Sequence, residues 1–539
     1  MPPVIPVKSL YSIVLDKVTS TLYHSAATGN FNSDDVRKYL LRVLHSGIRQ
    51  DLISSATKKY KADTGTVRFS TACKYNTYKL FDLIGLVLDS TIRRLHPIDQ
   101  DSFLWINECH ELFSCLENCQ AVGLEELSVR VRINPRHDLE FVSIMNTTFH
   151  RVLYKMTNLR VLILRSICDN EMLRLIGEHC PKLEHLDMTS SWLVDDRGIR
   201  HLLLKNPMSF YENDYSTSAD CEKTACCAHL KVVRIQDTNT TELGVIMLLL
   251  FIPQLRSLGG FIYYRNVGDA ILSLLDWKPS LFLRLTDLWD THLPDGKSEK
   301  LIYALPGLQS LYTRGTYLPR ISAWKFLTSL TIDFDFRDFG ALLEDFLAVC
   351  GPRLQKLAIV DQVHAMNLES MCQLCPALTE LTAKICCDIK DGRWRMSPKS
   401  RMPLLKIAKV RLETAEVLPA LLLCTPELTN LEIFYEQDGT SPDLDDVILS
   451  QALQSAKHAA DPPCLELLYI RTESSLGWLG LMDLLTFCPN LKCVGDLYHW
   501  SALDKTSLEQ LEELTIIRNW NLTILFQGVR LSAGNFLKM

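Results

Sequence analysis

The stretch that decides the fold is Asn170–Met188, NEMLRLIGEHCPKLEHLDM. Its first part, up to Cys180, places apolar residues at the spacing of a helix. Its second part has Leu183 and Leu186 three residues apart and a further apolar residue after them, which predicts a short strand with inward-pointing leucines. Such a strand and helix cannot bury their apolar faces alone, so the stretch predicts a unit that stacks on copies of itself.

The strand part of this stretch recurs along the chain, often behind Cys-Pro or a similar small pair. The copies begin at Gly123 (GLEELSV), Asn158 (NLRVLIL), Cys180 (CPKLEHLDM), Ala228 (AHLKVVRI), Ile252 (IPQLRSLGG), Leu305 (LPGLQSL), Phe326 (FLTSLTI), Cys350 (CGPRLQKLAI), Cys375 (CPALTELTA), Thr425 (TPELTNLEI), Pro462 (PPCLELLYI), Cys488 (CPNLKCV) and Gln510 (QLEELTII). The first leucines lie 24 to 26 residues apart in the pairs Leu159–Leu183, Leu230–Leu255, Leu354–Leu378 and Leu465–Leu491. The interval of 47 between Leu183 and Leu230 predicts a degenerate copy or an insertion.

The phrase and its period resemble the cysteine-containing subclass of leucine-rich repeats, over residues 120 to 520 or so. This resemblance implies an α/β fold: a leucine-rich-repeat solenoid, or horseshoe, with parallel strands on its concave face. We therefore expect a solenoid over residues 111–539 and a different block over residues 1–110.

The block before the repeats is predicted to be helical. Ser9–Leu22 has apolar residues at helical spacing, and Ser33 can cap a second helix that starts at Asp34 and runs to Ser54. Two more helices are predicted at Tyr78–Leu95 and Ser102–Cys119. Helices in this position can cap the open end of a solenoid, which terminal repeats require.

Ser9, Leu10 and Val18 match the pattern of the elongin-binding BC box, although Val14 stands where that box has a small residue or cysteine. The block resembles zyg-eleven-type receptors of elongin–cullin ligases, which place a BC box before leucine-rich repeats. The resemblance implies adaptor-binding residues in the first two helices: Leu10, Ile13, Val14, Val18, Val36 and Leu40.

A second resemblance is to F-box proteins with leucine-rich repeats, carried by Ile5-Pro6, Leu10 and Ile13. Both families imply a non-catalytic substrate-recognition subunit of a cullin-RING ubiquitin ligase. Its partners would be an adaptor (elongin BC or Skp-type), a cullin, and a target protein on the concave face. The alternative from another class is a stand-alone leucine-rich-repeat scaffold with no ligase link.

Composition narrows the function classes. The chain has 539 residues, 47% hydrophobic and 22% charged, with a net charge of −6, so a general polyanion binder is not expected. The apolar run Gly244–Pro253 is about half of the roughly 20 residues that a spanning helix needs, and the start of the chain does not resemble a signal peptide. We therefore expect a cytoplasmic or nuclear protein with reduced cysteines.

Catalytic motifs are missing from the sequence. It contains no GxSxG elbow, P-loop, HExxH or GxGxxG, so we expect neither an enzyme nor a cofactor or small-molecule substrate. Two cysteine groups have spacings that a zinc site could use: Cys372 with Cys375, and Cys221, Cys226 and Cys227 with His229. Cysteine is among the most often buried residues, so a core role is preferred and no metal is predicted.

The remaining candidates are binding surfaces. Alternate residues of the strands should face the concave surface, and Arg and Tyr are common interface anchors. Insertions are expected near 206–224, 388–401 and 437–463; the second is basic around Trp394 and favours a protein contact over RNA. The predicted partner-binding residues are Arg130, Arg165, His185, Asp187, Tyr312, Arg314, Asp333, Phe434, Tyr469 and Arg471.

Overall fold

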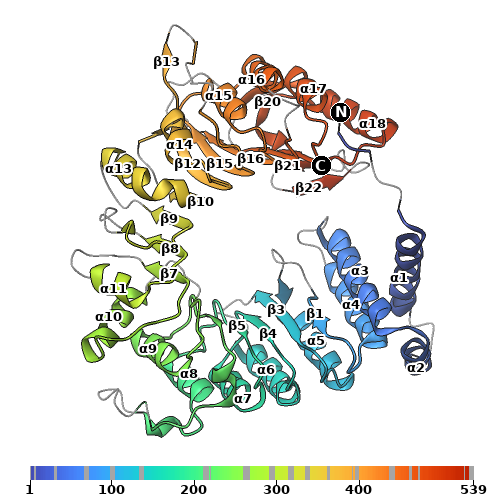
Figure 1. The fold of residues 1–539 in the computed structure, drawn as a ribbon. Coiled ribbons are helices and arrows are strands. Elements are labelled where there is room, and N and C mark those ends of the chain that lie inside the picture. Colours follow the sequence, from blue (N-terminus) through green and yellow to red (C-terminus); the bar gives the residue numbers. More distant parts are fainter. Residues whose placement is uncertain are drawn as a thin grey trace. The chain divides into compact units, whose positions relative to one another are not determined.

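The structure is a computed structural model that divides into two compact units (Figure 1). The first unit comprises Lys8–Asp290 and Tyr303–Gly307, and the second Met1–Val7, Thr291–Ile302 and Leu308–Met539. One of the boundaries between the units falls within α11 (Ser298–Ala304). The residues described are 2–4, 8–28, 33–65, 72–97, 103–132, 139–210, 218, 220–258, 267–290, 298–313, 321–333, 340–360, 364–390, 393–394, 400–435, 444–459, 464–471, 474–526 and 529–532.

The first unit is a mixed α/β structure built on a parallel sheet with strand order β1-β3-β4-β5-β6, in which β2 pairs with β3. Its strands are β1 (Arg94–Leu95), β2 (Leu104–Trp105), β3 (Glu126–Arg132), β4 (Val161–Arg165), β5 (His185–Asp187), β6 (Val232–Arg234) and β7 (Asp287–Asp290). Its helices are α1 (Leu10–Thr28), α2 (Ser33–Val43), α3 (Ser46–Gly65), α4 (Ala72–Val87), α5 (Ile106–Asn118), α6 (Leu139–Leu153), α7 (Asn170–His179), α8 (Asp196–Leu203), α9 (Glu242–Phe251) and α10 (Val267–Trp277).

The predicted stacking of strand–helix units is confirmed in this sheet. Neighbouring strands pair in chain order, and helices α6 to α9 lie along one side of them (Figure 1). Burial alternates along β4, so Leu162 and Leu164 are fully enclosed while their neighbours are half-exposed. One face of the sheet therefore lies in the apolar core. The other face, to which Val161, Ile163 and Arg165 of β4 belong, we call the outer strand face.

The long interval between Leu183 and Leu230 is an insertion and not a degenerate copy. β5 pairs directly with β6, with His185 opposite Val232, so no strand is missing between them. The extra chain returns to the end of α8, where the Thr224 hydroxyl donates to the Leu202 carbonyl at 2.6 Å. It therefore extends one repeat without interrupting the sheet.

The helical block differs from the prediction in three places. The helix predicted at Tyr78–Leu95 is α4, which ends at Val87, and Arg94–Leu95 form strand β1. The stretch predicted as one helix from Ser102 to Cys119 begins with strand β2, and α5 is its helical part. The single helix expected from Asp34 is two helices, α2 and α3, separated at Leu44–His45. Arg49, only 4% exposed, holds this break: it donates to the carbonyls of Leu44 and Val87 and pairs with Asp89 at 2.9 Å. The change from helices to repeats near residue 110 lies inside the first unit, so it is a change of architecture and not a division between compact units.

The apolar run Gly244–Pro253 lies mostly in α9, which is only ten residues long and mostly buried. Its N-cap is Thr241, whose hydroxyl accepts from the amide of Leu243 at 3.3 Å. Throughout the described ranges, no helix combines the length and the apolar character needed to cross a membrane. The run is therefore a core helix of a repeat.

The second unit repeats the same architecture with strand order β8-β9-β10-β12-β15-β16-β17-β19-β21-β22, parallel except for the last pair. Its strands are β8 (Ser310–Thr313), β9 (Ser329–Asp333), β10 (Lys356–Val360), β11 (Met366–Asn367), β12 (Glu380–Cys386), β13 (Ile389–Lys390), β14 (Arg393–Trp394), β15 (Ile407–Leu412), β16 (Asn430–Tyr435), β17 (Leu467–Ile470), β18 (Ser474–Gly477), β19 (Cys493–Gly495), β20 (Trp500–Ala502), β21 (Thr523–Phe526) and β22 (Val529–Ser532). Its helices are α13 (Gly340–Cys350), α14 (Leu368–Leu374), α15 (Val417–Cys424), α16 (Asp446–Ala459), α17 (Trp478–Phe487) and α18 (Lys505–Ile517).

Two repeats of this unit differ from the prediction. The copy assigned at Gln510 is wrong, because that stretch lies in α18, and the strand is β21, at Thr523. Asp504 caps α18 by accepting from the amide of Ser507 at 2.8 Å, which starts a helix where two leucines three apart also suit a strand. The strand β15 was not predicted, because Ala408 occupies the inward position that Leu381 and Leu431 fill in the neighbouring strands.

Candidate binding surfaces

The first candidate surface is the outward side of α1. Four apolar side chains are exposed there: Leu10 (77%), Ile13 (50%), Val14 (51%) and Val18 (37%). Their spacing places them within about 140° of one another around the helix axis. They are the residues that the BC-box resemblance selects, and we call them the α1 apolar face.

The opposite side of α1 packs on α3 and α4. Thr19 and Tyr23 are buried, at 1% and 5% exposure, and the Lys59 ammonium donates to the Ser20 hydroxyl at 2.7 Å. Leu22, expected on the same face as Leu10, is half-buried, whereas the α1 apolar face is exposed. The side of α1 with Thr19 and Tyr23 is therefore packed, whereas the α1 apolar face has no partner among the described residues.

The predicted adaptor residues of α2 lie in a different environment. Leu40 is buried and Val36 is half-buried. Between them, Arg37 donates to the carbonyls of Gly85 and Leu88, which ties α2 to the end of α4. These two apolar side chains mainly serve packing within the block, whereas the α1 face is open.

The second candidate surface is the outer strand face of the first unit, where four predicted residues gather. Arg130 lies opposite Arg165 in the sheet register, and His185 and Asp187 follow on β5. Asp187 is 1% exposed and accepts from the Nε and Nη2 atoms of Arg165 at 2.9 and 2.8 Å. Burial raises the pKa of Asp187, but the hydrogen bonds from Arg165 and Thr189 outweigh it, so the pKa lies below its ordinary value.

An exposed aromatic cluster adjoins this face and was not predicted. Phe103 and Trp105 are 41% and 50% exposed, and their rings meet edge to face at 5.8 Å. The Arg132 guanidinium carbon lies 5.0 and 5.6 Å from the two ring centres. Phe103 precedes β2 and Trp105 ends it, two residues apart, so their spacing predicts one shared side; only the pairing of β2 with β3 brings Arg132 to them.

In the second unit, two predicted partner-binding residues contact each other in the interior. The Tyr312 hydroxyl donates to Asp333 at 2.9 Å, and the two side chains are 8% and 6% exposed. They lie at outward positions of β8 and β9 but are covered. Arg314, predicted beside them, lies outside the described residues.

Three other predicted residues form one cluster in the second unit. The guanidinium carbon of Arg471 lies 5.1 Å from the centre of the Phe434 ring and 4.7 Å from that of Tyr469. Phe434 and Tyr469 are half-buried and Arg471 is exposed. An arginine over aromatic rings combines an apolar surface with hydrogen-bond donors, as at many interface anchors.

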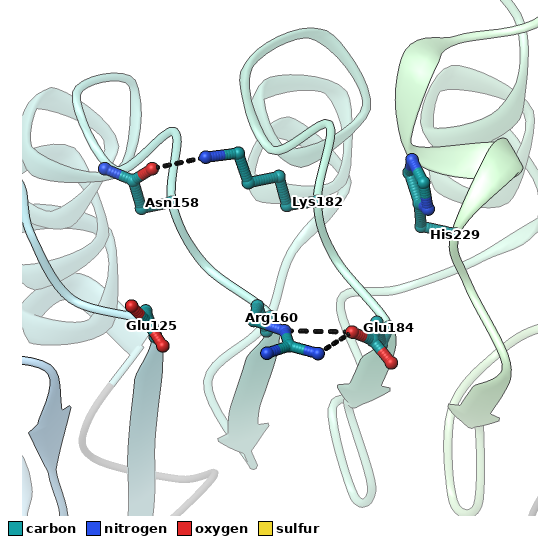
Figure 2. Close-up of a pocket in the computed structure, with 6 residues that line it drawn as sticks. All are labelled: Glu125, Asn158, Arg160, Lys182, Glu184 and His229. Carbon is teal, nitrogen blue, oxygen red and sulfur yellow. Dashed lines mark hydrogen bonds and ion pairs between the residues drawn. The ribbon is translucent and has the colours of Figure 1, made fainter.

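A pocket of about 340 Å³ lies where the chain enters the strands of the first unit (Figure 2). Glu184 is paired within the repeats: Arg160 donates to it through Nε at 2.9 Å, and Lys231 reaches the same carboxylate at 2.5 Å. These bonds hold the pKa of Glu184 below its ordinary value. The pocket is lined by Glu125, Asn158, Arg160, Lys182, Glu184 and His229.

The cysteine groups considered as zinc sites are placed in the core. Cys226 and Cys227 are 0% and 2% exposed, and both sulfurs lie within 3.4 Å of the Thr224 hydroxyl. Cys372 and Cys375 are also buried, at 4% and 0%. Over the described parts of the chain, no group of three or more His, Cys, Asp or Glu side chains could hold a metal ion.

The insertions are only partly described. The basic one contains a two-stranded antiparallel ribbon of β13 and β14, and residues 395–399 lie outside the described ranges. Of the acidic stretch after residue 436, the described part begins at Leu444, and the amide of Ile448 there donates to Asp445 at 2.8 Å. The proposed contacts through these loops therefore stay predictions.

Comparison with known proteins does not assign this chain to a family. No protein-family model matches the sequence, and no curated protein matches it. Among solved structures, the chain is similar to a chain in the crystal structure of the Rad7 and Elc1 complex of yeast, at a TM-score of 0.38 and 11% identity. That match covers 81% of this chain and 96% of the other. A similarity at this level carries no information on function.

Proposed function

We propose that this protein is a non-catalytic substrate-recognition subunit of a cullin-RING ubiquitin ligase, built as a leucine-rich-repeat solenoid. In this proposal α1 docks an adaptor of the elongin BC type, and the outer strand faces bind the target. Such a subunit performs no chemistry, but it raises the effective concentration of a target lysine near the ligase's recruited enzyme.

The observation that carries the adaptor half is the exposure of the α1 apolar face. Burying an apolar side chain yields about 1.5–3 kcal/mol, so a helix that leaves Leu10 at 77% exposure suits a partner that covers it. The packed side, with Thr19 and Tyr23, already anchors α1 to its own unit. The outward side is therefore not needed to hold the helix in place.

The test is affinity purification of the tagged wild-type chain beside Leu10→Asp, read for elongin BC, a Skp-type adaptor and a cullin. A charge in the middle of an apolar contact should reduce the captured adaptor at least tenfold. Leu479→Asp is the matched control, because Leu479 on α17 is 71% exposed and lies in the other unit. The control should capture the adaptor like the wild type.

The outcomes separate the alternatives. Elongin BC captured by the wild type and the control, and lost from a folded Leu10→Asp chain, supports the proposal. A Skp-type adaptor captured instead favours the F-box resemblance. If folded wild-type protein captures neither adaptor, the ligase proposal fails and a stand-alone repeat scaffold remains.

A further inference from the structure

The outer strand face of the first unit carries an excess of arginines. The outward positions of β1 and β3 to β6 include two acids, Glu126 and Asp187. Both acids already have basic partners: Glu126 pairs with Arg94 at 3.1 Å and His96 at 3.2 Å, and Asp187 accepts hydrogen bonds from Nε and Nη2 of Arg165. Among the described residues, these positions therefore offer no further acid to Arg132 and Arg234.

Arg234 is the first arginine of this face for which the described residues provide no acid. It lies opposite Asp187 in the register of β5 and β6, yet within the described ranges its side chain has neither an ion pair nor a hydrogen bond. Its Nε atom is enclosed without an acceptor, and so is Nε2 of the neighbouring His185. An enclosed guanidinium nitrogen without an acceptor is costly, and an incoming carboxylate would provide the missing countercharge beside it.

Arg132 is the second arginine of this face for which the described residues provide no acid. It is exposed at the end of β3 and, within the described ranges, contacts the rings of Phe103 and Trp105 but no acid. The two rings and the guanidinium offer an apolar surface beside a positive charge, which fits a carboxylate next to an apolar or aromatic side chain.

We infer that this face binds an extended acidic segment of a protein, with one carboxylate at Arg234, another at Arg132 and an apolar residue on Phe103 and Trp105. Three strand spacings and four residues along a strand separate the two arginines, or roughly 20 Å, which an extended peptide covers in about six residues. The inference rests on the proposed function, because it names the class of target that the first unit would recognise.

Carboxylates fit better than a phosphate backbone for two reasons. Asp187 lies beside Arg234 and repels a dianionic group more strongly than a single carboxylate. The arginines are also scattered between acids and aromatic rings, whereas a nucleic-acid groove follows the backbone with a continuous basic track.

The test is fluorescence anisotropy of the full-length chain with a labelled twelve-residue peptide that has two glutamates six residues apart and one phenylalanine. Arg234→Gln and Arg132→Gln should each weaken binding about tenfold, the effect of losing one charged hydrogen bond. Arg197→Gln removes the same charge from an exposed position on α8, on the helix-covered side, and should leave binding unchanged. Thermal melting of each variant checks that it folds.

Three results would overturn the inference: no binding of the peptide, equal weakening by Arg197→Gln, or tighter binding of a phosphorylated peptide or a single-stranded RNA. Leu10→Asp keeps the two proposals apart. This variant should bind the peptide like the wild type. If the wild type binds the peptide but captures no adaptor, the result contradicts only the proposed function. If the wild type captures the adaptor but does not bind the peptide, the result contradicts only this inference.

Discussion

Single acidic residues hold the turns between strands and helices. Asp169, which ends the turn after β4, caps α7: its Oδ1 accepts from the amide of Met172 at 2.7 Å, and its Oδ2 accepts from Asn146 at 2.7 Å. His150 approaches the same carboxylate at 3.3 Å. Burial raises the pKa of Asp169, but the bonds from His150, Met172 and Asn146 outweigh it and lower the pKa below its ordinary value.

Asp169→Ala should therefore cost about 2 kcal/mol at pH 7, from the lost cap and the unsatisfied amide of Met172. A group with a lowered folded pKa stabilises fully above its unfolded pKa of about 3.9, and this contribution is lost as the pH falls through the folded value. The gap between wild type and variant, measured by urea unfolding from pH 7 to pH 3, should shrink below about pH 4. Asp169→Asn keeps a capping oxygen and should cost less. A gap that is the same at pH 7 and pH 3 would contradict this reading.

Among the elements, α18 is a helix in a stretch where the leucine spacing of the repeats predicts a strand. Leu511 and Thr515 are buried while Glu513 between them is exposed, which is a helical pattern, since a strand would turn all three to one side. The helix spans Lys505–Ile517, so Glu513 lies in its interior.

Glu513→Pro should destabilise the protein by about 3 kcal/mol, because proline removes a helical hydrogen bond and clashes with the preceding turn. Glu513→Ala removes the same side chain without breaking the backbone and should stay within about 0.5 kcal/mol of the wild type. Chemical unfolding measures both. A proline variant as stable as the alanine variant would mean that the segment is not helical.

The chain divides into two compact units, each with its own buried apolar residues. Arg49, in the first unit, ties the ends of α2 and α4 together, and Leu511, in the second, is fully buried in α18. Since a domain with its own core can open by itself, damage to one unit should leave the other protected.

Hydrogen–deuterium exchange of the Arg49→Met and Leu511→Ala variants tests whether the two units open independently. Arg49→Met should cost about 3 kcal/mol and raise exchange in α2, α3 and α4, while β15 to β17 stay protected. Leu511→Ala should cost about 2–5 kcal/mol and raise exchange in α18 and β21 alone. Arg42→Met, at an exposed position of α2 seven residues before Arg49, is the control and should change neither. Raised exchange throughout the chain in either variant would show that the units unfold together.

The repeated leucine phrase was enough to predict most strands of the two large sheets, because alternation and periodicity are local properties of a segment. The same locality explains the failures. β15 was missed because Ala408 is too small to be recognised as an inward residue, and the break between α2 and α3 depends on Arg49 reaching the carbonyl of Val87, 38 residues away.

For the binding surfaces, the sequence alone determined which residues stand at outward positions: Arg165, Asp187 and Arg471 were found in this way. Only the tertiary structure decided what each one meets. It covers Tyr312 with Asp333, leaves Leu10 open on α1, and brings Phe103 and Trp105 to Arg132. The reason is physical: periodicity reports the side of an element on which a residue lies, whereas exposure and pairing depend on neighbours that are distant in the chain.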